Sequence, residues 1–109
     1  MIWRRLGAIM AAAADTASLL FQTGFGGRAE MGTAGSDDFS VKVSADGTAW
    51  FTALDADAAT GELTLPQPVH LGGQASDPVT PPDGTLWLNT TTGEVKLRSA
   101  GATSALGGG

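Results

Sequence analysis

One pattern, Asp-Gly-Thr-x-Trp followed by Thr-Gly-Glu-[Leu/Val]-x-Leu, occurs twice in this chain. The first copy begins at Asp46 and continues at Thr60, and the second begins at Asp83 and continues at Thr92. Each copy places strand-forming residues on both sides of a Gly-bearing turn, which is the pattern of a β-hairpin. The repeat therefore predicts an all-β chain of successive hairpins, forming either a small sandwich or an intertwined oligomeric fibre.

Alternation of apolar and polar residues marks the individual strands. In the segment 39–44, Phe39, Val41 and Val43 share one face, which we expect to point inward. The alternate residues, Ser40, Lys42 and Ser44, are expected to face water. The hairpin 85–98 carries four apolar residues on one face: Leu86, Leu88, Val95 and Leu97. Further strands are expected at 18–23, 28–33, 48–56 and 62–65, with a short one at 69–71. We expect each hairpin to have an apolar face two strands wide, and isolated hairpins are marginally stable.

Composition limits the core that a single copy can build. The chain has 109 residues and is 42% hydrophobic, but 18 of the hydrophobic residues are Ala and only 28 are large and apolar. The 16 Gly residues add entropy that folding must overcome. The sequence contains no Cys, so neither disulfides nor thiolate metal sites can compensate. We therefore expect a homo-oligomer, in which several copies share one core.

The charge distribution disfavours two classes of partner. The net charge is −5, and the six basic residues are scattered rather than gathered in a stripe with aromatics, so we expect no nucleic-acid binding. The apolar run 6–14 is far shorter than the roughly 20 residues that span a bilayer, so we expect no membrane insertion. This run after Arg4 and Arg5 resembles a weak signal peptide, but an attachment arm is the preferred interpretation.

Local amino-acid composition divides the sequence into four parts. Residues 1–14 form the N-terminal attachment arm, and residues 15–66 form a β-hairpin module. Residues 67–82 read as a Pro-rich connector, because Pro cannot donate to a central sheet ladder. Residues 83–109 are expected to form a C-terminal hairpin followed by a flexible Gly-rich tail.

A longer segment carries a family resemblance. Residues 15–32 read Asp-Thr-Ala-Ser-Leu-Leu-Phe-Gln-Thr-Gly-Phe-Gly-Gly-Arg-Ala-Glu-Met-Gly, and the similarity continues through 38–47 and 60–66. Over residues 11–66 the chain resembles a C-terminal segment of appendage proteins from alphaproteobacterial phages, prophages and gene transfer agents. Residues 81–93 resemble hairpins of phage fibre proteins. The larger relatives have a long N-terminal region that this sequence lacks, so we expect a free-standing module of the size of a small head spike.

The resemblance implies a role as well as a fold. It implies a fibre or head-spike subunit, synthesised in the bacterial cytoplasm and displayed on the surface of a phage-like particle. The implied partners are other copies of the chain, other particle proteins (the capsid, spike base or tail) and the capsular polysaccharide of the recipient cell. A trimer is expected because such fibres are commonly trimeric. It supplies no catalytic residue. A base or adaptor protein that anchors another fibre and binds no glycan is the alternative.

Three side chains are candidates for glycan contact. Within its hairpin Trp87 shares a face with Thr85 and Asn89, and Trp50 alternates away from Phe51. If these faces are the wetter ones, Trp50 and Trp87 can stack on sugar rings and Asn89 can hydrogen-bond to them. The alternative is that the same faces are buried in contacts between subunits, where Trp is also enriched.

No pattern predicts an enzyme, a cofactor or a metal site. His70 is the single His and lies among Pro residues without a nucleophile motif. The segment from Asp55 to Glu62 is similar to a calcium loop, but Ala59 occupies a ligand position and Gly61 falls one residue late. Turn chemistry explains this segment better. Carboxylate pairs capable of glycoside hydrolysis arise by chance among eleven acidic residues, so a polysaccharide depolymerase is the least favoured alternative.

Overall fold

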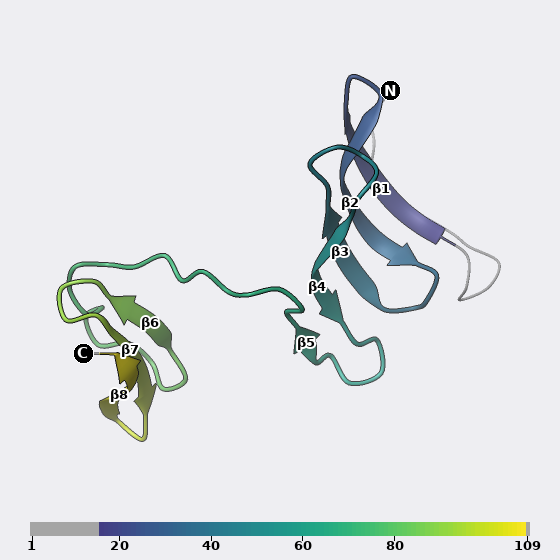
Figure 1. Cartoon of the computed structure of the whole chain (residues 1–109). Coiled ribbons are helices and arrows are strands. Elements are labelled where there is room, and N and C mark those ends of the chain that lie inside the picture. Colours follow the sequence, from purple (N-terminus) through teal and green to yellow (C-terminus); the bar gives the residue numbers. More distant parts are fainter. Residues whose placement is uncertain (1–15, 109) are drawn as a thin grey trace, which may run out of the picture. The chain divides into compact units, whose positions relative to one another are not determined.

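The structure is a computed structural model that describes residues 16–108, and every regular element within that range is a β-strand. The prediction of an all-β chain is confirmed. The chain divides into two compact units, with the boundary between Pro68 and Val69, and Figure 1 shows the strands of each. The predicted attachment arm, residues 1–14, lies outside the described range.

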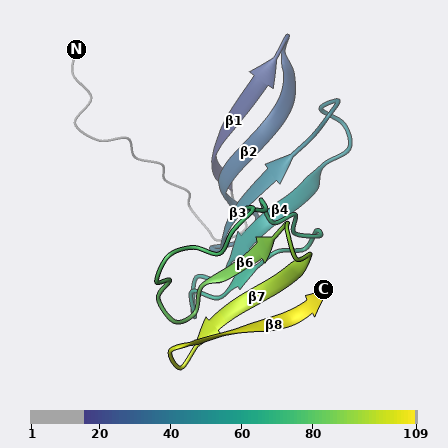
Figure 2. The ribbon, with the colours of Figure 1, turned by 90° about the vertical axis from the view of Figure 1, so that its left-hand side faces the viewer.

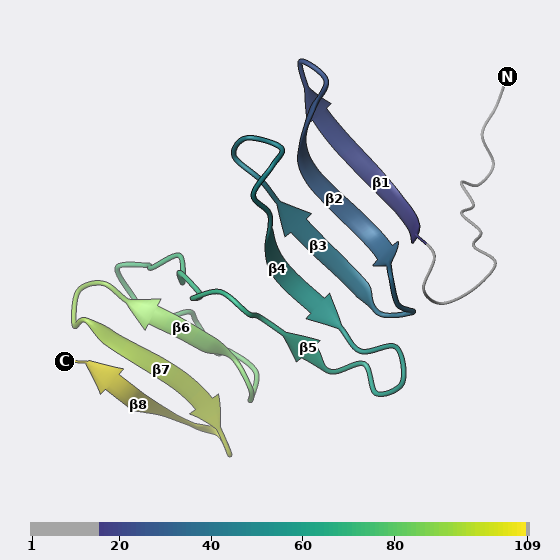
Figure 3. The same ribbon diagram turned by 45° about the vertical axis from the view of Figure 1, so that its right-hand side comes forward.

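The first unit is one antiparallel sheet of five strands in the order β1-β2-β3-β4-β5. Its strands are β1 (Thr16–Thr23), β2 (Gly26–Ala34), β3 (Phe39–Val43), β4 (Phe51–Ala56) and β5 (Leu63–Thr64). Figures 2 and 3 show β1 to β4 side by side in chain order as a single layer. The predicted hairpins therefore do not remain two strands wide, because each pairs with the next to build one sheet.

A two-residue turn joins β1 to β2. Thr23 pairs with Gly26 across the turn, so Gly24 and Phe25 are its central residues. Both have positive φ, 56° for Gly24 and 71° for Phe25, as a type I′ turn requires. Such a turn matches the right-handed twist of the strands and explains why the chain reverses sharply here.

Strand register gathers the apolar residues of the first unit on one face. Leu19 lies opposite Met31, Met31 opposite Val41, and Val41 opposite Leu54. Directly paired residues of neighbouring strands share a face, so the whole set points the same way. We call this set the apolar face: Ala17, Leu19, Phe21, Ala29, Met31, Thr33, Phe39, Val41, Val43, Phe51, Leu54, Ala56 and Leu63.

No second layer covers the apolar face within residues 16–68. Phe39 is 44% exposed and Val43 is 43% exposed, although both were predicted to point inward. Ser44, predicted to face water, is instead buried, at 8% exposure. The expected alternation is present in β3, but a single-layer sheet has no interior, so the apolar side of this strand remains in contact with solvent.

The second unit is a three-stranded antiparallel sheet in the order β6-β7-β8. It consists of β6 (Leu86–Asn89), β7 (Glu94–Ser99) and β8 (Ala102–Gly108). Leu86 lies opposite Leu97 and Leu88 opposite Val95, so the four residues share one face, as predicted. The predicted flexible tail is wrong for most of its length, because residues 102–108 pair with β7 as a third strand. The backbone of this Gly-rich and Ala-rich segment is thus ordered by ladder hydrogen bonds, with one side-chain bond from Arg98 Nη1 to Thr103 Oγ1 at 3.3 Å.

The segment predicted as a connector belongs mostly to the second unit, which begins at Val69. Residues 69–71 do not form the expected short strand. Gln74 instead lies beside β6 in a parallel bridge with Asn89. Its backbone N–H donates to Leu88 O at 3.0 Å, and its carbonyl accepts from the N–H of Thr90 at 2.8 Å. Pro68 and Pro78 flank this contact along the chain.

Candidate functional site

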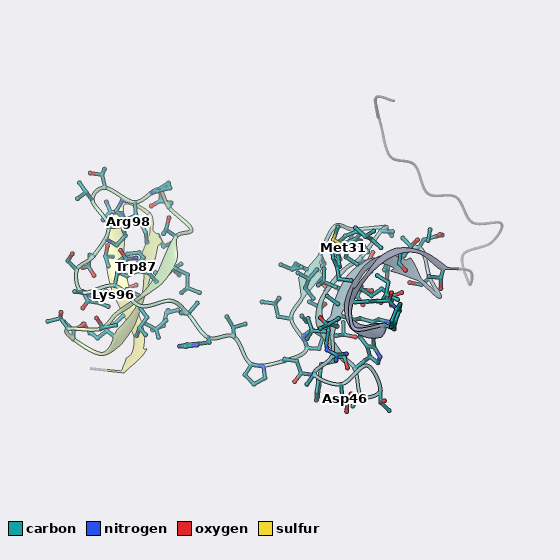
Figure 4. The ribbon with its side chains drawn as sticks, turned by 90° about the horizontal axis from the view of Figure 1, so that it is seen from above. Met31, Asp46, Trp87, Lys96 and Arg98 are labelled. Atoms are coloured by element: carbon teal, nitrogen blue, oxygen red, sulfur yellow. The ribbon has the colours of Figure 1, made fainter. Side chains whose placement is uncertain are left out.

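The three glycan candidates do not form one site. Trp50 lies in the first unit, whereas Trp87 and Asn89 lie in the second. Figure 4 shows Trp87 on the second unit with Lys96 and Arg98, while Met31 and Asp46 mark the first unit.

The loop between β3 and β4 is held by Ser44 and Asp46. The Ser44 hydroxyl donates to Ala49 O at 2.6 Å and accepts from the backbone N–H of Gly47 at 2.8 Å. Asp46 Oδ1 accepts from the N–H groups of Thr48 at 2.8 Å and Ala49 at 2.9 Å. The Ala49 N–H, followed by that of Thr48, holds the pKa of the Asp46 carboxyl below its usual value. These contacts define the first Asp-Gly-Thr-x-Trp copy as a loop stabilised by its own acidic side chain.

Trp50 packs against a glycine on β2. A Cβ placed on Gly27 would lie 2.8 Å from Trp50 Cζ2 and 3.3 Å from Leu20 Cδ1, so the indole occupies the space that a side chain there would fill. The Trp50 N–H donates weakly to Gly47 O at 3.3 Å. Phe51 points to the apolar face and Trp50 to the opposite face, as predicted. Trp50 is half-buried, so part of its ring remains accessible.

Phe25, at the tip of the β1–β2 turn, is the most exposed aromatic residue among residues 16–68. It is 97% exposed and is held at a φ of 71°, a conformation that costs an L-residue about 1–2 kcal/mol. The Gln22 side chain donates to its carbonyl oxygen at 3.3 Å, but the ring gains no burial within the chain. Sequence reasoning missed this residue. The available signal was a large aromatic within Gly-Phe-Gly-Gly, at a turn position where Gly is normally favoured.

We expect Phe25→Gly to stabilise the first unit by about 0.5–1 kcal/mol. Glycine removes the cost of the positive φ, and its greater freedom in the unfolded chain offsets only part of the gain. Urea unfolding followed by circular dichroism measures the change. Phe25→Ala is the matched control, because Ala also loses the ring but retains the unfavourable φ, and it should show no comparable gain. A large destabilisation by Phe25→Gly would show that the ring supports the fold.

Trp87 is an interior residue. It is 4% exposed and is the one large hydrophobic side chain in residues 16–108 that is buried. Glycan contact by Trp87 and Asn89 depended on their face being the wetter one, and that face is instead buried within the unit, since Asn89 is only 5% exposed. Their face of the sheet is correctly predicted, but the loop preceding β6 brings Asp77 onto it. Because Trp87 and Asn89 are both buried within their own unit, neither side chain presents an accessible surface to a sugar.

Asp77, whose side chain is 41% exposed, holds the two buried residues from the surface. We call the group the Asp77 cluster: Asp77, Trp87, Asn89 and Lys96. Asp77 Oδ1 accepts from Trp87 Nε1 at 2.9 Å and from Asn89 Nδ2 at 2.8 Å. Asp77 Oδ2 accepts from Lys96 Nζ at 3.0 Å in an ion pair. The amide of Asn89, then the indole of Trp87 and the ammonium of Lys96, lower the pKa of Asp77 from 3.8 to about 2. One carboxylate thus joins the irregular segment to two strands.

The second unit should be acid-sensitive because of Asp77. Its pKa in the folded chain, about 2, is below the unfolded value of 3.8, so its stabilising contribution is complete above 3.8 and is lost as the pH falls toward 2. The indole N–H resonance of Trp87 in proton NMR should shift or broaden in this range. The variant Asp77→Asn, which cannot ionise, should lose this transition. A Trp87 signal unchanged at pH 2 in the native chain would contradict the role of Asp77.

Asn89 has a second function as the cap of a turn. Its Oδ1 accepts from the N–H groups of Thr91 at 2.9 Å and Thr92 at 3.1 Å, while the N–H of Gly93 donates to Asn89 O at 2.9 Å. Asp57 makes the same set of contacts in the first copy of the repeat, with Ala59, Thr60 and Gly61 as partners. The repeat is therefore structural, a hairpin loop closed by an Asx side chain. The alternative of turn chemistry for the segment 55–62 agrees with these bonds.

Comparison with known proteins identifies no relative. No family model, no curated protein and no solved structure matches the chain. Within residues 16–108 no group of three or more His, Cys, Asp and Glu side chains is placed to hold a metal ion. The same range includes no helix long and apolar enough to cross a membrane. The structure itself must therefore carry the functional argument.

Proposed function

We propose that this chain is a non-enzymatic subunit of a particle appendage, a head spike or fibre of a phage or gene transfer agent, which binds host-cell surface polysaccharide. It works as a homo-oligomer, for which we propose three copies, anchored to other proteins of the particle. The resemblance of residues 11–66 to such appendage proteins supports the class of particle. The observation that carries the proposal is the open architecture of the first unit.

That unit is built for assembly rather than for existence as a single copy. In the described part of the chain no side chain is less than 2% exposed, and the one buried large hydrophobic residue, Trp87, belongs to the second unit. In folded proteins the apolar side of a sheet is normally covered by another layer of secondary structure. Catalytic sites need rigidly placed groups in concave, water-excluding surroundings, whereas an extended single layer suits a shaft made from several chains.

The dimensions of the sheet agree with three copies around an axis. Five strands about 4.8 Å apart make a layer about 19 Å wide. Three such layers forming a triangular prism would each stand about 5.5 Å from the axis, close to half of the roughly 10 Å that separates packed sheets. Side chains of the size of Leu, Met and Phe would fill that space. The proposed trimer is therefore sterically reasonable.

Adhesion is assigned to the end of the first unit that carries the β1–β2 turn and the β3–β4 loop, which lies against Gly27 at the start of β2. Phe25 is 97% exposed there, and Trp50 packs over Gly27, two residues further along the chain, on the side of the sheet opposite the apolar face. An aromatic ring held outward can stack on a sugar ring. Several copies on one oligomer would convert weak single contacts into firm attachment through multivalency.

A base or adaptor protein of the same particle is the second candidate. The specific observation in its favour is that Trp87 and Asn89, two of the three expected sugar contacts, are buried and hydrogen-bonded within their own unit. In that role the chain would hold another fibre, and Phe25 would contact a protein. Both candidates place the chain on a particle and differ in whether it binds glycan.

The test combines location with binding. Purified particles from a producing strain, examined by mass spectrometry and immunogold electron microscopy, should carry the chain at a spike or fibre. The isolated chain should retain capsular polysaccharide from the recipient strain, and Phe25→Ala should weaken that retention while leaving unfolding unchanged. Particle location without polysaccharide binding would establish the adaptor role. Absence from particles would overturn both candidates, and loss of polysaccharide viscosity on incubation would overturn the non-enzymatic assignment.

A further inference from the structure

We infer that the apolar face of the β1–β5 sheet is the surface through which copies of this chain associate, and that the opposite face remains outward in the assembly. This inference rests on the proposed function in that it names the interface of the proposed homo-oligomer.

The two faces of the sheet differ completely in charge. Within the five strands, paired register places Glu30 opposite Lys42 and Asp55 opposite Ser40, all on the face away from the apolar set. The apolar face itself contains no ionisable residue and only one hydroxyl, that of Thr33. A partner surface must therefore be apolar as well, since a charged or polar partner would lose its hydration without gaining hydrogen bonds.

The exposed area is that of a stable interface. Seven large side chains of the apolar face are between 40% and 57% exposed: Leu19, Phe21, Met31, Phe39, Val43, Phe51 and Leu63. Leu65, which follows β5, is 46% exposed. At roughly 150–200 Å² for a large side chain, about half exposed, these residues present about 600–800 Å², close to the roughly 800 Å² that each partner contributes to a standard protein–protein interface. An apolar patch of this size exceeds what monomeric proteins usually expose.

A second copy of the same face is the occupant that fits in size and chemistry. The three-stranded sheet of the second unit is about 10 Å wide by the usual strand spacing, so it covers roughly half of a five-stranded layer about 19 Å wide. An identical face matches the width, the length of the strands and the absence of charge at once. Closed symmetric assemblies of identical chains are also the commonest oligomers of soluble proteins, and in the proposed trimer the same face of all three copies would line the shared core.

The arrangement leaves the candidate contact residues free. Trp50 and Leu20 pack over Gly27 on the side opposite the apolar face, and Phe25 projects from the turn at the end of β1. Burying the apolar face thus covers none of the residues assigned to adhesion. The interface and the proposed recognition surface occupy different parts of the same unit.

The experiment compares two double variants of the full chain by sedimentation velocity and native mass spectrometry. Met31→Lys with Phe39→Lys places two charges on the apolar face, at positions 40% and 44% exposed in one copy. Ser40→Lys with Thr64→Lys adds the same charge on the opposite face, where Asp55 lies between the two sites. We expect the native chain and the second variant to form the same oligomer at micromolar concentration. The first variant should be monomeric, with its apparent association constant reduced at least tenfold.

Three outcomes would overturn the inference. In the first, the native chain is monomeric. Hydrogen exchange would then show whether the second unit covers the sheet and protects the amides of β1 to β5. The oligomer could survive Met31→Lys with Phe39→Lys, or both variants could dissociate equally. Circular dichroism in the far ultraviolet identifies a variant that has unfolded instead, and Phe39→Thr, which keeps strand propensity, then replaces it and should also weaken association. An oligomer that is never found on particles would support this interface while contradicting the proposed function.

Discussion

Replacing Trp87 with Ala should unfold the second unit while leaving the first unit paired. Truncating a buried Trp costs about 3–5 kcal/mol, because transfer energy is lost and a cavity remains. Trp87 is 4% exposed and its N–H donates to Asp77 Oδ1 at 2.9 Å, so the change also removes a partner from the carboxylate. A unit of this size has about 0.1 kcal/mol of stability per residue to lose. The expected destabilisation is therefore comparable to its total stability.

Hydrogen exchange followed by NMR measures this effect for each unit in the full chain. In Trp87→Ala the amides of β6, β7 and β8 should lose protection, while those of β2 and β3 should retain it. Trp50→Ala is the matched control, since Trp50 is half-buried and its N–H bond to Gly47 O is long at 3.3 Å. That variant should affect the first unit alone, and by less. Retained protection throughout β6 to β8 in Trp87→Ala would show that the Asp77 cluster is not the core of the second unit.

The strands were predictable where local chemistry determines them. The alternation at Phe39, Val41 and Val43 identifies β3, and the opposed Leu86–Leu97 and Leu88–Val95 pairs follow from turn position. The role of Asn89 was also within reach of the sequence. Both Asn89 and Asp57 stand four residues before the Gly of Thr-Gly-Glu, and both cap the turn with a side-chain oxygen. Local spacing therefore contains enough information for strands and turns.

The long-range features were not predictable in this way. Nothing in the Pro-rich segment indicates that Asp77 binds Trp87 and Lys96, because those contacts depend on how the loop returns over the sheet. For the same reason the correct face of Trp87 was predicted but its burial was not. Alternation shows which residues share a face. It does not show what covers that face, and for Phe39 and Val43 residues 16–68 supply no cover.

Replacing Gly32 with Ala should detach β1 from the sheet. Gly32 has a φ of +140° and lies opposite Ser18 on β1. A Cβ at this position would collide with the carbonyl oxygen of Ala17 and lie 2.8 Å from the Cα of Ser18, so the obstacle is backbone, which cannot rotate away. The unfavourable φ and the forced separation together should cost about 2–4 kcal/mol. Loss of amide protection in β1, with β3 and β4 retained, is the expected signature.

The control for this prediction is Gly72→Ala. A Cβ added at Gly72 would point into open space, and this residue has no positive φ, so that change should leave both units unaffected. Detaching β1 also removes Leu19 and Phe21 from the apolar face, so Gly32→Ala should weaken self-association in the same sedimentation experiment even though it adds no charge. If Gly32→Ala lost β1 protection and yet formed the native oligomer unchanged, β1 would lie outside the interface. The association would then depend on the face formed by β2 to β5 alone.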